Sequence, residues 1–215
     1  MLTDLLPGLL QAPLTATDPA DDEILDAALV EAVAFGLRRT TMDEVARRAG
    51  VGRMTVYRRF GTKEELLRRL IVREAYRLVV AVGDATKAEP DLADRIVTGF
   101  VTILRLTREH PLIDRLVHVE PDVLTDLSTL EHPDLVGLGR AFIAAELHRA
   151  KANGTIGDVD PDQVAEVVVR LVISFVVLPR SVVDVTDDAA ARAFARSVLV
   201  PILTGGAPSP KRKKR

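Results

Sequence analysis

The chain has 215 residues, 47% of them hydrophobic and 28% charged, so it can bury a sizeable core and is not a fully disordered chain. It contains no cysteine, which excludes disulfides, thiolate metal sites and a cysteine nucleophile. Its net charge is only −2, yet residues 37–80 hold 12 basic and 5 acidic side chains, which indicates one segment that faces a polyanion.

The first 17 residues are rich in leucine but contain no lysine or arginine, so they lack the basic start of a secretory signal. We interpret residues 1–17 as an N-terminal arm, either a frayed end or a segment that packs on a neighbouring subunit. The apolar run at residues 171–179 is nine residues long and cannot cross a bilayer, which requires about 20 residues. We therefore expect a cytoplasmic protein without a membrane partner.

The first predicted helix begins near residue 18. Asp18 can cap this helix, and Pro19 suits its first position, where a missing N–H costs nothing. Apolar residues at helical spacing then form one face as far as Gly36, which can end the helix.

Two capping boxes define the next elements. Thr41 and Glu44 predict the start of a short helix that ends at Gly50, and another short helix follows over residues 53–59. A second box at Thr62–Glu65 predicts the start of a long helix that continues to about residue 82.

The second half of the chain predicts five more helices, bounded mainly by prolines, and neither a strand nor an internal repeat. Their expected ranges are 91–109, 111–129 with a break around Pro121, 133–152, 161–178 and 187–203. The predicted fold class is therefore all-α. Residues 206–215 form a basic tail that we expect to be disordered. Its end, Lys211–Arg215, either adds sequence-independent attraction to DNA or has no function.

Residues 41–60, TMDEVARRAGVGRMTVYRRF, predict two short helices joined by a glycine-containing turn, which is a helix-turn-helix. Apolar residues at helical spacing would form the small core between the helices. The side chains left facing outward on the second helix are Arg53, Met54, Thr55, Tyr57, Arg58 and Arg59. Such a face suits the major groove of DNA, and Lys63 and the two capped helix starts suit phosphates.

The segment resembles the tetracycline-repressor (TetR) family of bacterial transcriptional regulators over roughly residues 24–80. The matching residues are Thr41, Val45-Ala46, Ala49-Gly50-Val51, Thr55-Val56-Tyr57, Phe60, Thr62-Lys63-Glu64 and Leu66. The resemblance implies an N-terminal three-helix DNA-binding domain, residues 18–82, joined by a long helix to a ligand-binding and dimerisation domain, residues 83–205.

The resemblance also implies roles for the outward side chains. Arg53, Met54, Thr55 and Arg59 would approach base edges, with Arg58 on the same helix. Thr41 and Lys63 would reach phosphates, and Tyr57 would reach a phosphate or stack beside the DNA backbone. Two positions depart from the family pattern. Gly52 stands where a capping serine or threonine is common, and Arg59 stands where histidine or tyrosine is common, a change that favours guanine.

A homodimer and a small-molecule pocket are further implications of the resemblance. The predicted dimer contacts are Val168, Leu171, Phe175, Ala193, Phe194 and Val198. The predicted pocket residues are Phe100, Ile103, Leu104, Leu116, Val119, Phe142 and Leu147, although each also suits an ordinary core position. With no tryptophan and a bias to valine, leucine and isoleucine, the chain favours a small apolar effector.

No enzyme is expected, because the sequence contains no nucleophile elbow, phosphate-binding loop, dinucleotide fingerprint or zinc-protease motif. The four histidines lack the spacing of metal ligands, so neither a metal nor a cofactor is expected. The expected function is a repressor that binds double-stranded DNA at a palindromic operator and is released by its effector. The alternative is a helical dimeric protein-interaction module without specific DNA binding.

Overall fold

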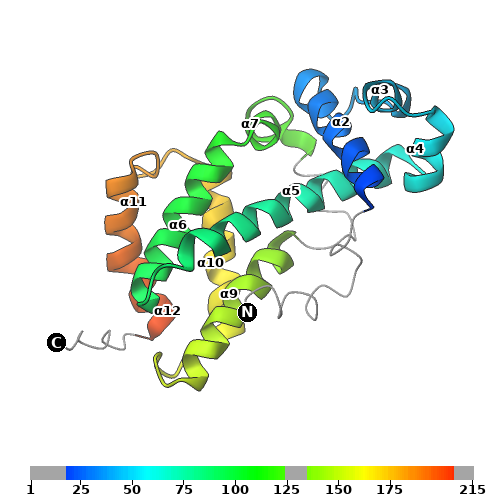
Figure 1. Ribbon diagram of the computed structural model, residues 1–215. Coiled ribbons are helices and arrows are strands. Elements are labelled where there is room, and N and C mark those ends of the chain that lie inside the picture. The colour runs from blue at the N-terminus through cyan, green and yellow to red at the C-terminus, as the bar shows by residue number, and fades with distance from the viewer. Residues whose placement is uncertain (1–17, 124–134, 206–215) are drawn as a thin grey trace. The chain divides into compact units, whose positions relative to one another are not determined.

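The computed structural model describes residues 18–123 and 135–205 (Figure 1). Every regular element in these ranges is a helix, so the predicted all-α fold is confirmed. The helices are α2 (Pro19–Phe35), α3 (Met42–Arg48), α4 (Arg53–Phe60), α5 (Lys63–Thr86), α6 (Leu92–Glu109), α7 (Pro111–His118), α9 (Leu135–Ala152), α10 (Pro161–Val177), α11 (Asp188–Phe194) and α12 (Val200–Thr204). The predicted arm at 1–17, the tail at 206–215 and the predicted helical residues 124–129 lie outside the described residues.

The predicted helix starts are confirmed by their hydrogen bonds. The Asp18 carboxylate accepts the N–H of Ala20 at 3.1 Å, with Pro19 as the first residue of α2. The Thr41 hydroxyl accepts the N–H of Glu44 at 3.3 Å and donates to the Glu44 carboxylate at 2.8 Å. At the start of α5 the Thr62 hydroxyl accepts the N–H of Glu65 at 3.2 Å. Local capping therefore determines where these helices begin.

Two predicted helices are interrupted. The helix expected over 111–129 is broken where the sequence predicts it, because α7 ends at His118 and helical residues resume at 121–123. The helix expected over 187–203 is interrupted by one turn of π-helix, Ala195–Leu199, in which Val200 donates its N–H to the carbonyl of Ala195. Pro201, which has no N–H to donate, follows directly and favours this change in hydrogen bonding.

The helices form two compact units, which we call unit 1 and unit 2. In the described residues, unit 1 contains 18–76 and 110–123, and unit 2 contains 77–109 and 135–205. Unit 1 is therefore discontinuous in sequence, because the chain returns to it with α7. The predicted functional boundary at residue 82 stays a prediction.

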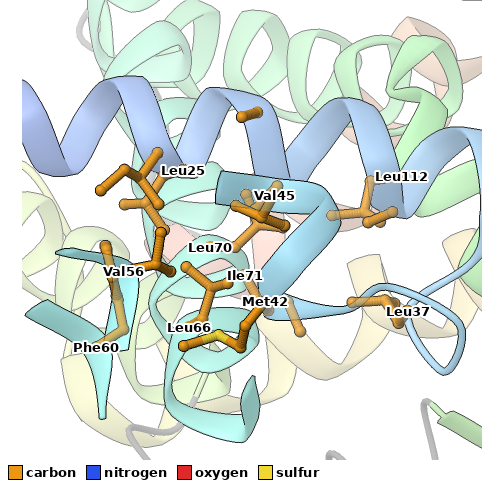
Figure 2. Packing of buried hydrophobic residues seen from close by; sticks show 14 of the residues in the cluster. Leu25, Leu37, Met42, Val45, Val56, Phe60, Leu66, Leu70, Ile71 and Leu112 are labelled. Atoms are coloured by element: carbon orange, nitrogen blue, oxygen red, sulfur yellow. The ribbon is translucent and has the colours of Figure 1, made fainter. Parts of the chain in front are cut away.

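Unit 1 has a core built from five helices, α2, α3, α4, α5 and α7 (Figure 2). The labelled core side chains are Leu25, Leu37, Met42, Val45, Val56, Phe60, Leu66, Leu70, Ile71 and Leu112. α4 buries Val56 and Phe60 in this core and packs the half-buried Tyr57 against it. Few apolar side chains therefore hold this short helix.

α7 also contacts the end of α2 through polar groups. Arg115 donates to the carbonyl of Val33 at 3.1 Å and to the Glu120 carboxylate at 3.2 Å. Glu120 in turn accepts the N–H of Leu37 at 3.0 Å. Between them lies Gly36, where a Cβ atom would stand 2.8 Å from Glu120 Oε1. The backbone of this turn is therefore enclosed by the two charged side chains.

The core of unit 2 contains three phenylalanines that pack edge to face or tilted. The ring centroids of Phe100 and Phe175 are 6.1 Å apart, and Phe194 lies 5.8 Å and 5.6 Å from them. In the same unit α9 and α10 approach closely, since a Cβ on Gly139 would lie 3.1 Å from Val169. Within residues 18–123 and 135–205, no helix combines the length and the hydropathy needed to span a membrane.

Candidate nucleic-acid interface

The turn between α3 and α4 gives the predicted helix-turn-helix its geometry. Gly50 has φ +67°, and Val51 donates its N–H to the carbonyl of Ala46 at 3.0 Å. Gly52 precedes α4 without a side-chain cap, and Gly61 ends the helix with φ +74°. α4 is therefore an eight-residue helix set between two tight glycine turns.

The buried side chains of α4 identify its outer face. Val56 and Phe60 are 0% and 3% exposed, and they point into the core of unit 1 (Figure 2). Arg58 follows Val56 by two residues, which places it about 200° around the helix on the opposite side. Met54, beside it, is 75% exposed. Met54 and Arg58 therefore form the centre of the face that α4 turns to solvent.

Arg53 lies on one flank of this face and has a partner within the protein. Its guanidinium contacts the Asp43 carboxylate at 2.8 Å and 3.0 Å and lies 5.2 Å from the centre of the Tyr57 ring. A hydrogen bond of 3.4 Å joins Arg53 to the Tyr57 hydroxyl, and this contact and Asp43 raise the pKa of Arg53. The exposed Arg53 therefore packs on the half-buried Tyr57 along one flank of α4.

Arg59 lies on the other flank, with only 26% of its side chain exposed. Its Nη1 donates to Asp18 at 2.7 Å and to Asp21 at 2.6 Å, both in the first turn region of α2. The hydrogen bonds with Asp18 and then Asp21 raise the pKa of Arg59, and the bond from Arg59 lowers the pKa of Asp18. Sequence reasoning placed this arginine on the base-reading face, whereas here it is bound to α2.

The predicted phosphate-binding residues lie at the starts of two helices. Thr41 is exposed and caps α3, and Lys63 begins α5 and donates to the carbonyl of Arg38 at 2.6 Å. Thr55 is half-buried in the first turn of α4. All eight predicted DNA-contacting residues belong to unit 1.

Two exposed arginines of unit 1 lie outside the predicted set. Arg39 precedes the Thr41 cap, and Arg47 lies in the last turn of α3. Among the described residues neither has a hydrogen-bond or ion-pair partner, and the same is true of Arg58. Their sequence neighbours Arg38 and Arg48 form ion pairs with Asp122 and Glu31. The sequence alone could not show which arginine of each adjacent pair is available to contact DNA.

The predicted effector residues are divided between the two units. Phe100, Leu104 and Leu147 are buried in the core of unit 2, and Ile103 and Phe142 are half-buried in the same unit. Leu116 belongs to the core of unit 1, while Val119 is 60% exposed. Five of the seven are thus in one unit.

The predicted dimer residues all belong to unit 2, but they differ in exposure. Val168 and Phe175 are buried, and Leu171 and Phe194 are half-buried against the same core. Ala193 and Val198 are exposed. Other apolar side chains on α10 and α12 are exposed as well, among them Val167 at 56%, Val177 at 40% and Ile202 at 43%.

Comparison with known proteins gives matches across both units. Residues 24–70 match the family described as "Bacterial regulatory proteins, tetR family", and residues 91–198 match "Bacterial Tetracyclin repressor, C-terminal domain". The chain is 32% identical over 195 residues to the HTH-type transcriptional regulator Rv1255c of Mycobacterium tuberculosis, with 87% of each chain covered.

Two solved structures share the fold. The TetR family repressor AlkX from Dietzia sp. strain DQ12-45-1b, implicated in biodegradation of n-alkanes, aligns with a TM-score of 0.62 at 22% identity, covering 85% of this chain and 96% of that one. The transcriptional regulator FadR from Bacillus subtilis, solved in complex with stearoyl-CoA, aligns with a TM-score of 0.58 at 18% identity, covering 87% and 99%.

Proposed function

The chain belongs to the TetR family of bacterial transcriptional regulators, and we propose from this premise that it is a repressor that a small apolar effector releases from a palindromic operator. Regulators of this family bind DNA as dimers and bind small-molecule effectors. The observation that carries the proposal is the outer face of α4, where the exposed Met54 and Arg58, which has no partner among the residues that the structure describes, lie opposite the two core side chains.

The proposed interface has a base-reading part and a phosphate-binding part. Arg58, Met54 and Thr55 are placed to approach base edges in the major groove, with Arg53 beside them once it leaves Asp43. Tyr57, Thr41 and Lys63 would contact phosphates, together with the exposed Arg39 and Arg47. This division assigns sequence preference to α4 and general affinity to the rim around it.

A homodimer is proposed through the exposed apolar side chains of α10 and the last helical segment. Val167, Val177, Val198 and Ile202 are 38% to 56% exposed, which is costly for a lone chain and favourable against a second copy. A two-fold axis would then present two copies of α4 to a palindromic site.

The proposed effector is apolar and binds unit 2. Support comes from the valine-, leucine- and phenylalanine-rich interior of that unit and from the printed associations of the two structural neighbours with n-alkane degradation and stearoyl-CoA. An effector releases DNA only if it binds the protein conformation that cannot bind DNA more tightly than the one that can. Equal affinity for the two conformations would leave their equilibrium unchanged. We propose that this preference acts through α5, which contributes residues to both units. The place of action is the cytoplasm, where the operator would be found.

The proposal is tested by fluorescence anisotropy on DNA from upstream of the protein's own gene, with a scrambled duplex of equal length as control. Tight binding to the first duplex alone supports a sequence-specific regulator. Adding an acyl or alkyl compound should then release that duplex. Equal binding to both duplexes, falling steeply with salt, would contradict sequence-specific binding at this site.

A further inference from the structure

We propose that Arg59 does not read bases but positions the recognition helix, by joining α4 to the start of α2, and that its neighbour Arg58 is the cation α4 turns to DNA. This inference rests on the proposed DNA-binding function. It concerns which of two adjacent arginines contacts the duplex and which acts through the orientation of the helix.

The contacts of Arg59 are short and partly enclosed. Nη1 lies 2.7 Å from Asp18 and 2.6 Å from Asp21, and the Asp21 side chain is only 16% exposed. Arg69 of α5 approaches Asp21 at 3.7 Å and also covers the ring of Phe60, 5.2 Å from its centre. Asp21 is therefore bound from α4 and from α5 at once. Moving Arg59 to a base would break two ion pairs beside a poorly solvated carboxylate.

α4 needs such a contact because little else holds it. It is eight residues long, it has no side-chain cap at Gly52, and only Val56 and Phe60 are buried. Tyr57, half-buried against the same core, is the one further apolar contact of α4 in the described residues, so the apolar contacts of this short helix are few. Without DNA, the bonds of Arg59 on one flank and the Arg53–Asp43 pair on the other tie α4 to α2 and α3, and only the Arg59 bonds remain once Arg53 turns to the duplex.

Arg58 has the opposite environment. It is exposed, lies on the side of α4 away from the core, and has no hydrogen-bond or ion-pair partner among the described residues. A free guanidinium can bind the O6 and N7 atoms of guanine without first losing a protein partner. The two arginines therefore differ in availability although they are adjacent in sequence.

The Asp18→Asn/Asp21→Asn double variant separates the two roles, because it removes the carboxylates and leaves Arg59 in place. Asparagine caps a helix about as well as aspartate, so α2 keeps its start. If Arg59 reads bases, the loss of two negative charges beside it should strengthen DNA binding. If Arg59 positions α4, the same change should weaken operator binding.

The probe is a duplex that the wild-type protein has enriched from a random pool, together with every single base-pair change in it. We expect Arg59→Ala to lose affinity by about threefold or more, and the double variant to lose affinity by a smaller factor because its charge change favours DNA, both with an unchanged base-preference profile. Combining them should cost nothing further, since both break the same contact. Arg58→Ala should instead alter the preference at one base pair in each half-site.

Hydrogen exchange of the amides of residues 53–60, measured without DNA, gives a readout independent of the operator. Exchange should be faster than in the wild type for Arg59→Ala and for the double variant. Arg59→Lys should exchange more slowly than Arg59→Ala, and Arg58→Ala should match the wild type. Tighter operator binding by the double variant, or a base-specific change in Arg59→Ala, would overturn the inference. If the wild-type protein enriches no duplex, the proposed function fails, and hydrogen exchange alone then decides whether Arg59 holds α4.

Discussion

At the scale of single residues, adjacent side chains of the same type have different surroundings. Arg58 and Arg59 share a helix and a charge, but only Arg59 faces the acidic start of α2. Glu64 and Glu65 differ in the same way, because Glu65 binds Arg68 and Arg69 while Glu64 has no partner among the described residues. Such pairs supply matched controls for substitutions.

Lys63→Ala tests the phosphate-binding part of the interface. We expect weaker binding to operator and scrambled duplexes by a similar factor, and a salt slope smaller by about 1, because a phosphate contact carries no sequence information. Anisotropy over a range of salt concentrations measures both quantities. Lys87→Ala, in an exposed residue of unit 2 that pairs with Asp84, is the control and should leave the slope unchanged. A loss confined to the operator would contradict the assignment.

Glu65 makes the free energy of unfolding depend on pH. The hydrogen bond from Arg68, with a further one from Arg69, lowers the pKa of Glu65 to about 2 from 4.5, although burial opposes the change. Since the folded state favours the ionised carboxylate, Glu65 stabilises the fold fully above pH 4.5, and this stabilisation is lost as the pH falls towards 2. Allowing for solvent screening, we expect about 1 kcal/mol.

The measurement is urea unfolding at a series of pH values from neutral to acid. Glu65→Gln should lower the free energy of unfolding at neutral pH, and its difference from the wild type should vanish at the acid end. Glu64→Gln should follow the wild-type curve throughout. A difference that is constant with pH would mean that the carboxylate charge is not the cause.

At the scale of elements, the sequence predicts where helices begin, and where a glycine or proline ends them, better than where they change form. Asp18, Thr41 and Thr62 cap their helices through contacts with residues two or three positions away, so a short stretch of sequence contains the whole signal. The contacts that Arg115 of α7 and Glu120 make with the distant end of α2 could not be predicted in this way. No local pattern encodes such contacts.

Gly36→Ala should destabilise unit 1 more than Gly50→Ala. Both glycines have positive φ, +98° and +67°, but only at Gly36 would a Cβ meet other atoms, 2.8 Å from Glu120 and 2.9 Å from Arg115. We expect the free energy of unfolding to fall by about 3 kcal/mol for Gly36→Ala and by about 1 kcal/mol for Gly50→Ala, where only the backbone conformation is unfavourable. Thermal and urea unfolding measure the two losses. Equal losses would show that Arg115 and Glu120 move aside freely.

At the scale of the whole molecule, the family and fold class follow from the sequence, but the exposure of individual side chains does not. The spacing of Val168 and Phe175 on an apolar helix is the same whether they face the core or a second chain. In the structure, Phe175 packs against the rings of Phe100 and Phe194 in the core of unit 2. Likewise, Leu116 and Phe100 are equally apolar in sequence, yet they belong to different units.

Val167→Glu tests the proposed dimer face. Val167 is 56% exposed on α10, so a charge there costs little in a lone chain but would be buried in the dimer. We expect sedimentation velocity to show a shift from dimer to monomer and operator affinity to fall with it. Val30→Glu, at a residue of α2 that is 47% exposed in unit 1, should remain dimeric. A dimeric Val167→Glu variant would place the interface elsewhere.

The discontinuity of unit 1 limits how its DNA-binding part can be moved between proteins. A fragment cut near residue 82 would keep α2 to α4 and most of α5 but lose Leu112, Leu116 and the Arg115–Glu120 contacts with the end of α2. A gene fusion or a single recombination event at that point would therefore transfer an incomplete core. A chimaera with a new operator preference is better made by exchanging the surface residues of α3 and α4 than by exchanging the N-terminal segment as a block.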